Sequence, residues 1–297
     1  MTLHKILNIL ILIFFILMIV SMFQYYRSKK KDGKNETRLE RNRKAVQKQE
    51  KDLLGKRMLI EREGKPAVRV NFYRYEADRQ VPAIFVAHGG SLLDGDADQI
   101  DTFCHRASDL WGCNIISINY TKMDKQNPPY QQMEIADTVK YFAIHSGQYG
   151  IQSSKIAFVG FSGGALLLSG AQAYLAEIGL KIRGIVDFYP VIDESMMTLA
   201  KMHMITCPVT LVTTDDSKNN EKIMAFYDAL IKSGIKVERK EYPDAHTGFI
   251  EFNNPEYEQN PKFKKMVPLF CDDEQKTLAQ ACEIWMRGVL AEYFMDE

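Results

Sequence analysis

The feature that most constrains this chain is the regular alternation of short apolar runs and helical stretches that follows residue 57. The runs are Met58–Arg62, Val68–Tyr75, Val81–Ala87, Asn114–Asn119, Lys155–Val159, Ile182–Phe188, Val209–Thr213 and Val237–Tyr242. The helical stretches are roughly Asp98–Trp111, Tyr130–His145, Ser162–Ile178, Asn220–Ser233 and Asp273–Phe294. The first two runs alternate apolar and polar residues, which is typical of an antiparallel pair. The rest predicts an α/β fold with about eight strands, mostly parallel, and helices on both faces.

A glycine-rich turn joins one of these runs to a helix. Lys155–Val159 leads into Gly160-Phe161-Ser162-Gly163-Gly164, and an apolar helical stretch follows at once. A serine on a tight strand-to-helix turn needs small residues two positions to either side, because the backbone there passes close to adjacent elements. Reacting groups in parallel sheets gather at the carboxyl ends of strands. A phosphate-binding glycine loop is disfavoured because neither GxGxxG nor GxxxxGK[ST] is present. We therefore expect Ser162 to be a nucleophile.

A serine hydroxyl is a poor nucleophile at its free pKa and needs a neighbouring base. The chain has six histidines. His105 and His145 fall within predicted helices, where packed or solvated roles are expected. His246 instead lies on a loop just after the last run, which ends at Tyr242. The sequence therefore predicts His246 as the base for Ser162.

The residue that orients the imidazole should follow the preceding strand. Val209–Thr213 runs into Thr214, Asp215 and Asp216. Either aspartate satisfies the order serine, aspartate, histidine, and the other would suit the N-terminus of the next helix. The residues alone leave this choice open.

Acyl transfer also needs hydrogen-bond donors directed at the oxyanion. One expected donor is the backbone N–H of Gly163, the residue after the nucleophile. The others are expected in the loop after Val81–Ala87, at Gly89 and Gly90, because glycine lets the backbone approach a substrate closely. We expect His88 in this loop to have a structural role.

The N-terminus carries a separate signal. Ile6–Phe23 is apolar except for Asn8 and Ser21. Extended to Tyr26, a helix here would be about 30 Å long, which is enough to cross the hydrocarbon core. A cleaved signal peptide is the alternative, but the apolar stretch is long for one and no small-x-small cleavage site follows. Residues 1–26 are therefore expected to form one transmembrane anchor.

A basic segment follows the predicted anchor. Residues 27–57 contain 13 Lys or Arg and five Asp or Glu. The positive-inside rule places such a segment, and the body after it, in the cytoplasm, and anionic headgroups would attract it. It could be a solvated helix or a disordered linker. The five cysteines show no metal-like spacing, which suits free thiols in a reducing compartment. The predicted domains are thus 1–26 anchor, 27–57 basic linker and 58–297 catalytic domain.

With these residues in view, the chain resembles the α/β-hydrolase superfamily over roughly residues 58–297. The nearest resemblance is to the acetyl-esterase and hormone-sensitive-lipase-like carboxylesterases. That group has a His-Gly-Gly(-Gly) loop, a strand ending in Asp-Tyr-Arg and a Gly-Asp-Ser-Ala-Gly-Gly elbow. The equivalents are His88-Gly89-Gly90-Ser91, Ile118-Asn119-Tyr120-Thr121 and Gly160-Phe161-Ser162-Gly163-Gly164. The departures are Ser91 for the third glycine, Phe161 for aspartate, and Thr247 between His246 and Gly248.

The resemblance implies a serine carboxylesterase that hydrolyses small or acetyl-type esters through an acyl-enzyme, without cofactor, metal or nucleic acid. It implies the triad Ser162, Asp215 and His246, since matching the spacing to the following helix without a gap favours Asp215 over Asp216. The oxyanion hole would be Gly89, Gly90 and Gly163. Tyr189–Pro208 is too short for a large lid, and Asn253–Phe270 is the expected extra wall of the site. The alternatives are a serine peptidase or lipase of this fold, or a membrane-tethered, non-catalytic binding protein.

Overall fold

The structure is a computed structural model that describes residues 38–217, 219–255, 257 and 265–295. It divides into two compact units, Met1–Ala45 and Val46–Glu297. The predicted anchor, residues 1–26, lies outside the described residues. None of the helices in the described part of the chain combines the length and apolar character that a membrane crossing needs. The anchor therefore stays a prediction.

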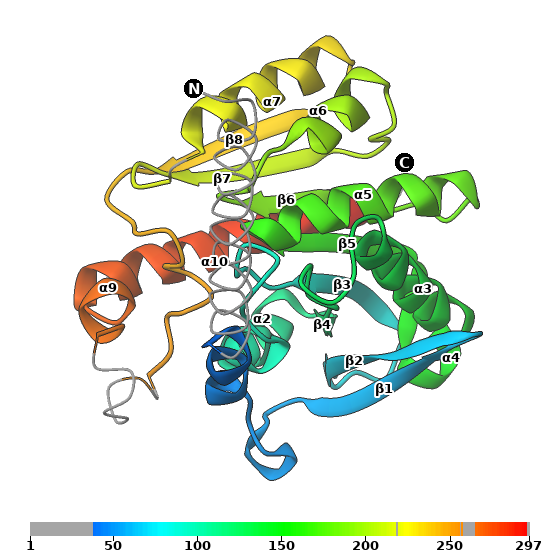
Figure 1. The fold of residues 1–297 in the computed structure, drawn as a ribbon, viewed down its shortest axis with the longest axis horizontal. Helices are drawn as coiled ribbons and strands as arrows, with labels where there is room; N and C mark the ends of the chain where they lie inside the picture. The colour runs from blue at the N-terminus through cyan, green and yellow to red at the C-terminus, as the bar shows by residue number, and fades with distance from the viewer. Residues whose placement is uncertain (1–37, 218, 256, 258–264, 296–297) are drawn as a thin grey trace, which may run out of the picture. The chain divides into compact units, whose positions relative to one another are not determined.

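The second unit is built on one eight-stranded sheet (Figure 1). Its strands are β1 (Lys56–Arg62), β2 (Lys65–Tyr73), β3 (Val81–Ala87), β4 (Asn114–Asn119), β5 (Ile151–Phe161), β6 (Ile185–Phe188), β7 (Val209–Thr214) and β8 (Val237–Tyr242). They lie in the order β1-β2-β4-β3-β5-β6-β7-β8. β2 pairs antiparallel with β1 and β4, and the other pairs are parallel. The predicted α/β fold with a mostly parallel sheet is confirmed.

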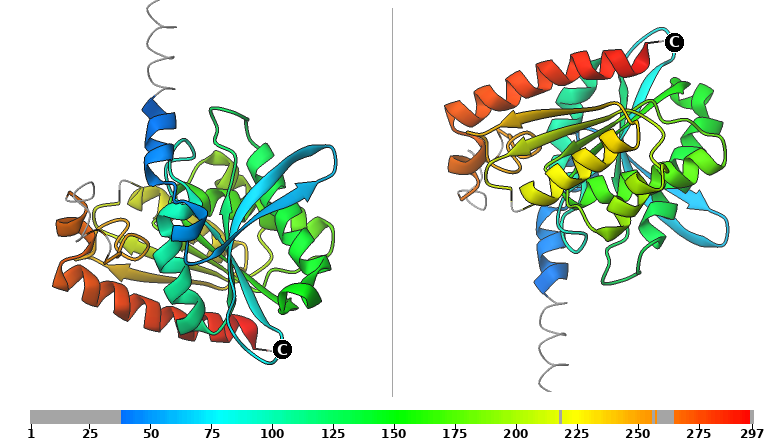
Figure 2. Two further views of the ribbon diagram at one scale, coloured as in Figure 1. Left: turned by 90° about the horizontal axis from the view of Figure 1, so that it is seen from below. Right: turned by 90° about the horizontal axis from the view of Figure 1, so that it is seen from above.

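Helices cover both faces of this sheet (Figure 2). They are α2 (Asp101–Trp111), α3 (Tyr130–Ile144), α4 (Ser146–Tyr149), α5 (Gly163–Glu177), α6 (Glu194–Lys201), α7 (Asn220–Lys232), α9 (Val267–Phe270) and α10 (Asp273–Phe294). Successive strand residues point to opposite faces, so Phe85 packs in the core under α3 and α5, whereas Ile84 and Val86 pack in the core under α2 and α10. The sequence analysis missed α6, which begins where the Asp193 side chain accepts a hydrogen bond from Met196 N–H.

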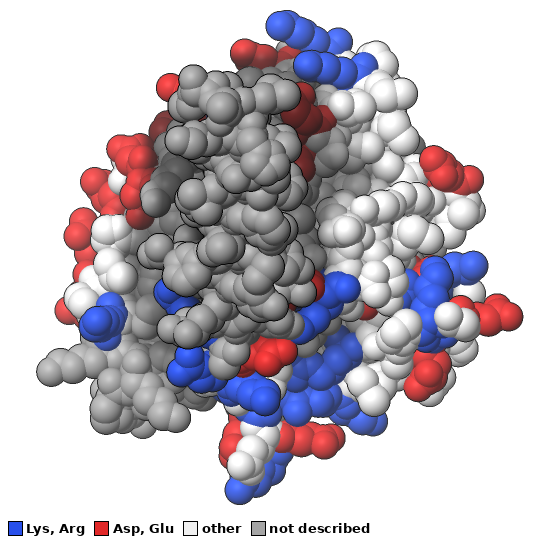
Figure 3. Space-filling model, in the orientation of Figure 1, with Lys and Arg blue, Asp and Glu red and all other residues white. Residues whose placement is uncertain are grey.

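Charged side chains on the antiparallel edge are paired rather than segregated by sign. Over the outer end of the β1–β2 hairpin, basic and acidic side chains lie side by side (Figure 3). Arg62 on β1 and Lys65 on β2 both form ion pairs with Asp137 of α3, at 2.8 Å and 3.2 Å. This edge of the sheet is thus tied to α3 by ion pairs as well as by apolar packing.

The last part of the basic segment, residues 46–57, belongs to the second unit and packs on buried carboxylates. Arg57 Nη2 lies 2.6 Å from Asp98, and Lys48 Nζ lies 3.0 Å from Asp101. The backbone N–H of Lys48 also donates to Asp98, at 2.9 Å. Both carboxylates are fully buried, so their charge must be compensated locally. This stretch is therefore neither a single solvated helix nor a free linker.

Asp98 is the centre of this network. It also accepts hydrogen bonds from Arg69 Nη1 and from Asn71 Nδ2 of β2. We expect Asp98→Ala to lower the free energy of unfolding by about 3–5 kcal/mol, because it removes a fully buried carboxylate to which the half-buried Arg57 and Arg69 are paired. Urea unfolding of the full chain measures this. Asp78→Ala, at an exposed position, is the control and should change it by no more than about 0.5 kcal/mol. Equal effects of the two changes would contradict the account.

Candidate active site

Ser162 sits on a strained turn between β5 and α5. Its φ is 51° and its ψ is −115°, a conformation that non-glycine residues rarely adopt and that clusters at functional sites. Backbone hydrogen bonds hold it there. Ser162 N–H donates to Phe188 O at 3.0 Å, and Ser162 O accepts from Ala165 N at 3.2 Å and from Val191 N at 3.1 Å. The end of β6 and the first turn of α5 together fix the turn.

The glycines flanking this turn are required by contact, as the sequence analysis expected. A Cβ added at Gly160 would lie 2.4 Å from Ala165 Cα. One added at Gly164 would lie 2.2 Å from Ala87 O, at the end of β3. Both distances are far below van der Waals contact and involve backbone atoms, which cannot move aside cheaply. The turn thus packs closely against the start of α5 on one side and the end of β3 on the other.

Several backbone N–H groups beside Ser162 make no hydrogen bond within the described residues. The Cβ position of Gly89 lies 3.5 Å from Ser162 Cβ, so the loop after β3 runs alongside the serine. Within the described residues, the N–H groups of Gly89, Gly90 and Gly163 have no acceptor. Buried or half-buried N–H groups are normally paired. Three unpaired donors around one serine can stabilise a developing negative charge on a bound group.

His246 lies on the loop after β8, and α10 holds that loop. Gln275 of α10 is buried. Its Oε1 accepts from His246 N–H at 3.0 Å, and its Nε2 donates to Asp244 O at 2.8 Å. One side chain thus fixes the backbone on both sides of Ala245. The position of the His246 ring therefore depends on a helix distant in sequence.

The carboxylate that faces His246 is that of Asp216. His246 Nδ1 lies 3.4 Å from Asp216 Oδ2, and Thr247 donates to Asp216 from its backbone N–H and its hydroxyl, at 2.9 Å and 2.7 Å to Oδ1. Partial burial raises the pKa of Asp216, but hydrogen bonds from Thr247, Thr214 and His246 outweigh it, so this pKa lies below its ordinary value. The carboxylate is therefore charged near neutral pH.

The geometry does not follow the sequence-based preference for Asp215. β7 continues through Thr214, which pairs with Tyr242 at the end of β8. Asp215 comes directly after the strand and is exposed, and within the described residues no hydrogen bond joins it to His246. The turn thus contains one residue more than an ungapped match to the related esterases allows. Asp216, the other aspartate at this turn, is the one that contacts the His246 ring.

The structure assembles the site in two halves at the carboxyl ends of the strands. Ser162 and the glycine N–H groups follow β5 and β3, and His246 and Asp216 follow β8 and β7. No hydrogen bond joins Ser162 Oγ to the His246 ring among the described residues. Catalytic hydrogen bonds of this kind are often long in free enzymes and tighten when substrate binds.

A buried pair next to both halves escaped the sequence analysis. Tyr189 follows β6 and has a φ of 37°. Its hydroxyl group donates a hydrogen bond to the carboxylate of Glu251, five residues beyond His246. Both side chains are buried. Burial raises the pKa of Glu251 to about 7, although the bond from Tyr189 lowers it in part. A single glutamate between Ile250 and Phe252 gives no sequence signal for this role.

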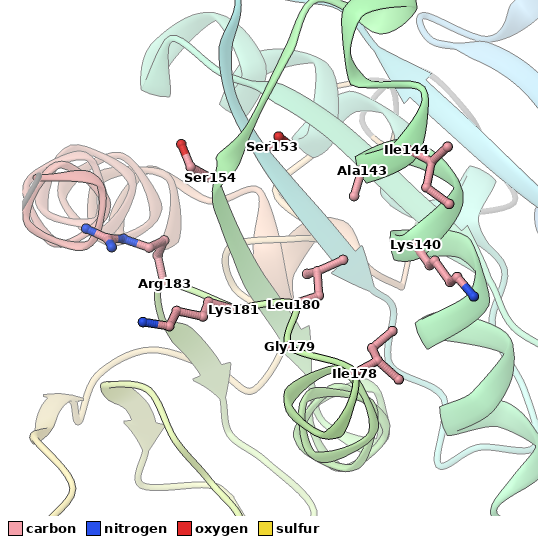
Figure 4. A pocket seen from close by; sticks show the side chains of 10 residues that line it. All are labelled: Lys140, Ala143, Ile144, Ser153, Ser154, Ile178, Gly179, Leu180, Lys181 and Arg183. Carbon is pink, nitrogen blue, oxygen red and sulfur yellow. The ribbon is translucent and has the colours of Figure 1, made fainter.

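Other candidate sites in the described residues are weaker. A depression of about 600 Å³ is lined by Lys140, Ile144, Ser154, Ile178 and Lys181, among others (Figure 4). It lies at the amino ends of β5 and β6, opposite to Ser162. The described residues contain no group of three or more His, Cys, Asp or Glu side chains placed to hold a metal ion. Much of the predicted extra wall, Asn253–Phe270, lies outside the described residues.

Comparison with known proteins agrees with this geometry. A family model described as the alpha/beta hydrolase fold matches residues 84–226. The acetyl esterase of Salmonella paratyphi B is 25% identical over 103 residues, which are 35% of this chain and 32% of that protein. The acetyl esterase of Salmonella choleraesuis is 28% identical over 94 residues, 32% of this chain and 29% of that protein. The match thus spans about a third of the length of these relatives.

Solved structures show the same fold. The carboxylesterase EstE1 from a metagenomic library superposes with a TM-score of 0.67 at 16% identity, covering 87% of this chain and 95% of that chain. The esterase LipW of Mycobacterium marinum gives 0.66 at 16% identity, covering 86% and 88%. The chain thus has the α/β-hydrolase fold. Among proteins of this fold, it resembles the acetyl-esterase and hormone-sensitive-lipase-like carboxylesterases.

The Tyr189–Glu251 pair predicts how stability depends on pH. A carboxyl group whose pKa is raised in the folded state stabilises the fold at low pH, and this contribution is lost as pH rises through the folded-state pKa. Between about pH 4.5 and pH 7 we expect the free energy of unfolding to fall by up to about 3 kcal/mol through Glu251. Glu251→Gln should remove this slope, whereas Glu63→Gln, at an exposed position, should keep it. Urea unfolding at several pH values measures both, and an unchanged slope in Glu251→Gln would contradict the assignment.

Proposed function

We propose that the chain is a serine carboxylesterase that hydrolyses small, acetyl-type esters through an acyl-enzyme. The observation that carries this proposal is the strained backbone of Ser162 beside the unpaired N–H groups of Gly89, Gly90 and Gly163. A strained serine is typical of a functional site. N–H groups that have no acceptor in the protein can bind the oxygen of a substrate carbonyl, which becomes negative when the serine attacks. The similarity to acetyl esterases supports the same reaction class.

In the proposed mechanism, Ser162 Oγ attacks the ester carbonyl and His246 Nε2 takes the hydroxyl proton. Asp216, at His246 Nδ1, holds the ring in the required tautomer and stabilises the imidazolium. The N–H groups of Gly89, Gly90 and Gly163 hold the oxyanion. Collapse of the tetrahedral intermediate breaks the ester C–O bond, and His246 returns the proton to the leaving alcohol. Water then releases the acid by the same steps and restores the Ser162 hydroxyl.

The fold favours small substrates. The connection between β6 and β7 contains α6 (Glu194–Lys201), a helix of eight residues. In α/β hydrolases this connection is where a large lid domain would have to be inserted, and twenty residues cannot form one. A short acyl group on a small alcohol, or on an exposed position of a larger molecule, can reach such a site.

The triad assignment is tested with a short-chain nitrophenyl ester and the full chain. Ser162→Ala should lower kcat by at least about 10⁴-fold with the fold unchanged, because no nucleophile remains. Ser154→Ala, at an exposed position of β5 far from the site, is the matched control. Undetectable turnover in the unmutated protein, or equal turnover in Ser162→Ala, would overturn the proposal.

The same assay distinguishes the two aspartates. Asp216→Asn should lower kcat by about 10³- to 10⁴-fold, as expected when the base loses the carboxylate that orients it. Asp215→Asn, one residue away and exposed, should change kcat by less than about threefold. The reverse order of effects would assign the role to Asp215.

We also propose that residues 1–26 anchor the enzyme as a single-pass membrane protein with its catalytic domain in the cytoplasm. The apolar stretch Ile6–Phe23 and the Lys- and Arg-rich segment after it support this placement. After alkaline carbonate extraction, the full chain should remain with the membranes, and a variant lacking residues 1–26 should be released at high salt. Recovery of the full chain in the supernatant would contradict the proposal.

A further inference from the structure

A buried lysine lies beneath the proposed oxyanion hole. Lys122 follows β4 and is only 7% exposed. Its Nζ lies 2.8 Å from His88 Nε2, donates to Tyr120 O at 2.9 Å and sits 4.0 Å from the centre of the Tyr120 ring. Burying an ammonium is costly unless it is well compensated. Nothing in the mechanism above uses this cation.

The lysine determines the protonation state of His88. An ammonium group has three donors and no acceptor, so the His88 Nε2 atom facing it must supply the lone pair. Burial, and then the charge of Lys122, lower the pKa of His88 well below its ordinary value. His88 is thus a neutral imidazole whose single proton is on Nδ1.

The proton on Nδ1 fixes the neighbouring peptide. His88 Nδ1 lies 2.6 Å from Gly89 O, so the ring donates to this carbonyl. In a trans peptide the C=O and N–H point in opposite directions, and Gly89–Gly90 is trans. The N–H of Gly90 therefore points away from His88. A Cβ added at Gly89 would lie 3.5 Å from Ser162 Cβ, so the Gly89–Gly90 peptide borders the serine.

The ring of His88 is itself held tightly. It stacks on Tyr120 with ring centres 4.4 Å apart and planes at 14°, and Tyr120 Oη donates to His88 O at 2.9 Å. A 180° flip of the ring would keep this stack but would place carbon atoms where Nδ1 faces Gly89 O and Nε2 faces Lys122 Nζ. The tautomer of His88, which Lys122 sets, therefore decides whether His88 Nδ1 can donate to Gly89 O.

We propose that Lys122 is a positioning residue for the oxyanion hole, which holds His88 with its proton on Nδ1 and thereby directs the Gly90 N–H toward the substrate. This inference rests on the proposed esterase function. It predicts that Lys122 affects the rate of the chemical step rather than substrate binding, because the oxyanion forms only after attack. It also predicts that the effect passes through His88.

A double-mutant cycle on the full chain tests this route. Lys122→Met keeps the length of the side chain without its charge and should lower kcat about 10- to 100-fold for a nitrophenyl ester, with KM changed less than about threefold. His88→Asn places an amide donor near the Nδ1 position and needs no lysine. In the His88→Asn background, Lys122→Met should therefore lower kcat less than about twofold. Lys140→Met on α3, which lines the distant depression, should leave kcat unchanged.

A second measurement observes the His88 ring directly in the unmutated protein. In ¹⁵N-histidine spectra, assigned with His88→Asn, His88 should be neutral with its proton on Nδ1 between pH 5 and pH 8. A proton on Nε2 or a doubly protonated ring would overturn the inference, as would equal kcat losses from Lys122→Met in both backgrounds or no loss in either. Absence of ester turnover in the unmutated protein would overturn the proposed function instead, and with it the role assigned to Lys122.

Discussion

The backbone of Ser162, held at positive φ between β5 and α5, is the constraint on which the rest of the site depends. Strain of this kind persists only where the surrounding structure over-determines it. Here Phe188 O of β6 accepts from Ser162 N–H, and Val191 N–H, just beyond β6, donates to Ser162 O. A side chain at Gly160 or Gly164 would collide with backbone. The parallel sheet therefore does more than present a serine at its carboxyl edge. It fixes the backbone conformation of the serine and, within the described residues, leaves the N–H of Gly163 without an acceptor.

The remaining groups are each held by a different part of the fold. Thr247 and His246 share the Asp216 carboxylate, Gln275 of α10 fixes the backbone of the His246 loop, and the Tyr189–Glu251 pair ties that loop to the end of β6. Precise placement of catalytic groups requires such supporting contacts, because small displacements are costly in rate. Contacts from β6, β7 and α10 meet at the loop that carries His246, and Lys122 contacts His88 in the loop after β3.

Features with a local pattern could be predicted from the sequence, and those made by tertiary pairing could not. The strands, the main helices and the elbow at Ser162 follow from periodicity and glycine spacing. The choice between Asp215 and Asp216 depends on whether the turn after β7 is one residue longer than in related esterases. An ungapped match of the sequences cannot detect such an insertion. Three charged residues, Lys122, Glu251 and Asp98, are buried because they pair with residues distant in sequence. The sequence around each of them gives no sign of this and predicts an exposed charge. The same applies to residues 46–57, whose charge suggested a linker but whose partners are the buried carboxylates of Asp98 and Asp101.

The most direct test of the central claim is covalent labelling of the full chain with a fluorophosphonate, followed by peptide mass mapping. Such a reagent phosphonylates a serine only where a base and an oxyanion hole activate it, and fluoride leaves as the P–O bond forms. We expect one adduct, on Ser162, and its loss in Asp216→Asn at matched reagent concentration and reaction time. No adduct on the folded protein, or an adduct on another serine, would contradict it.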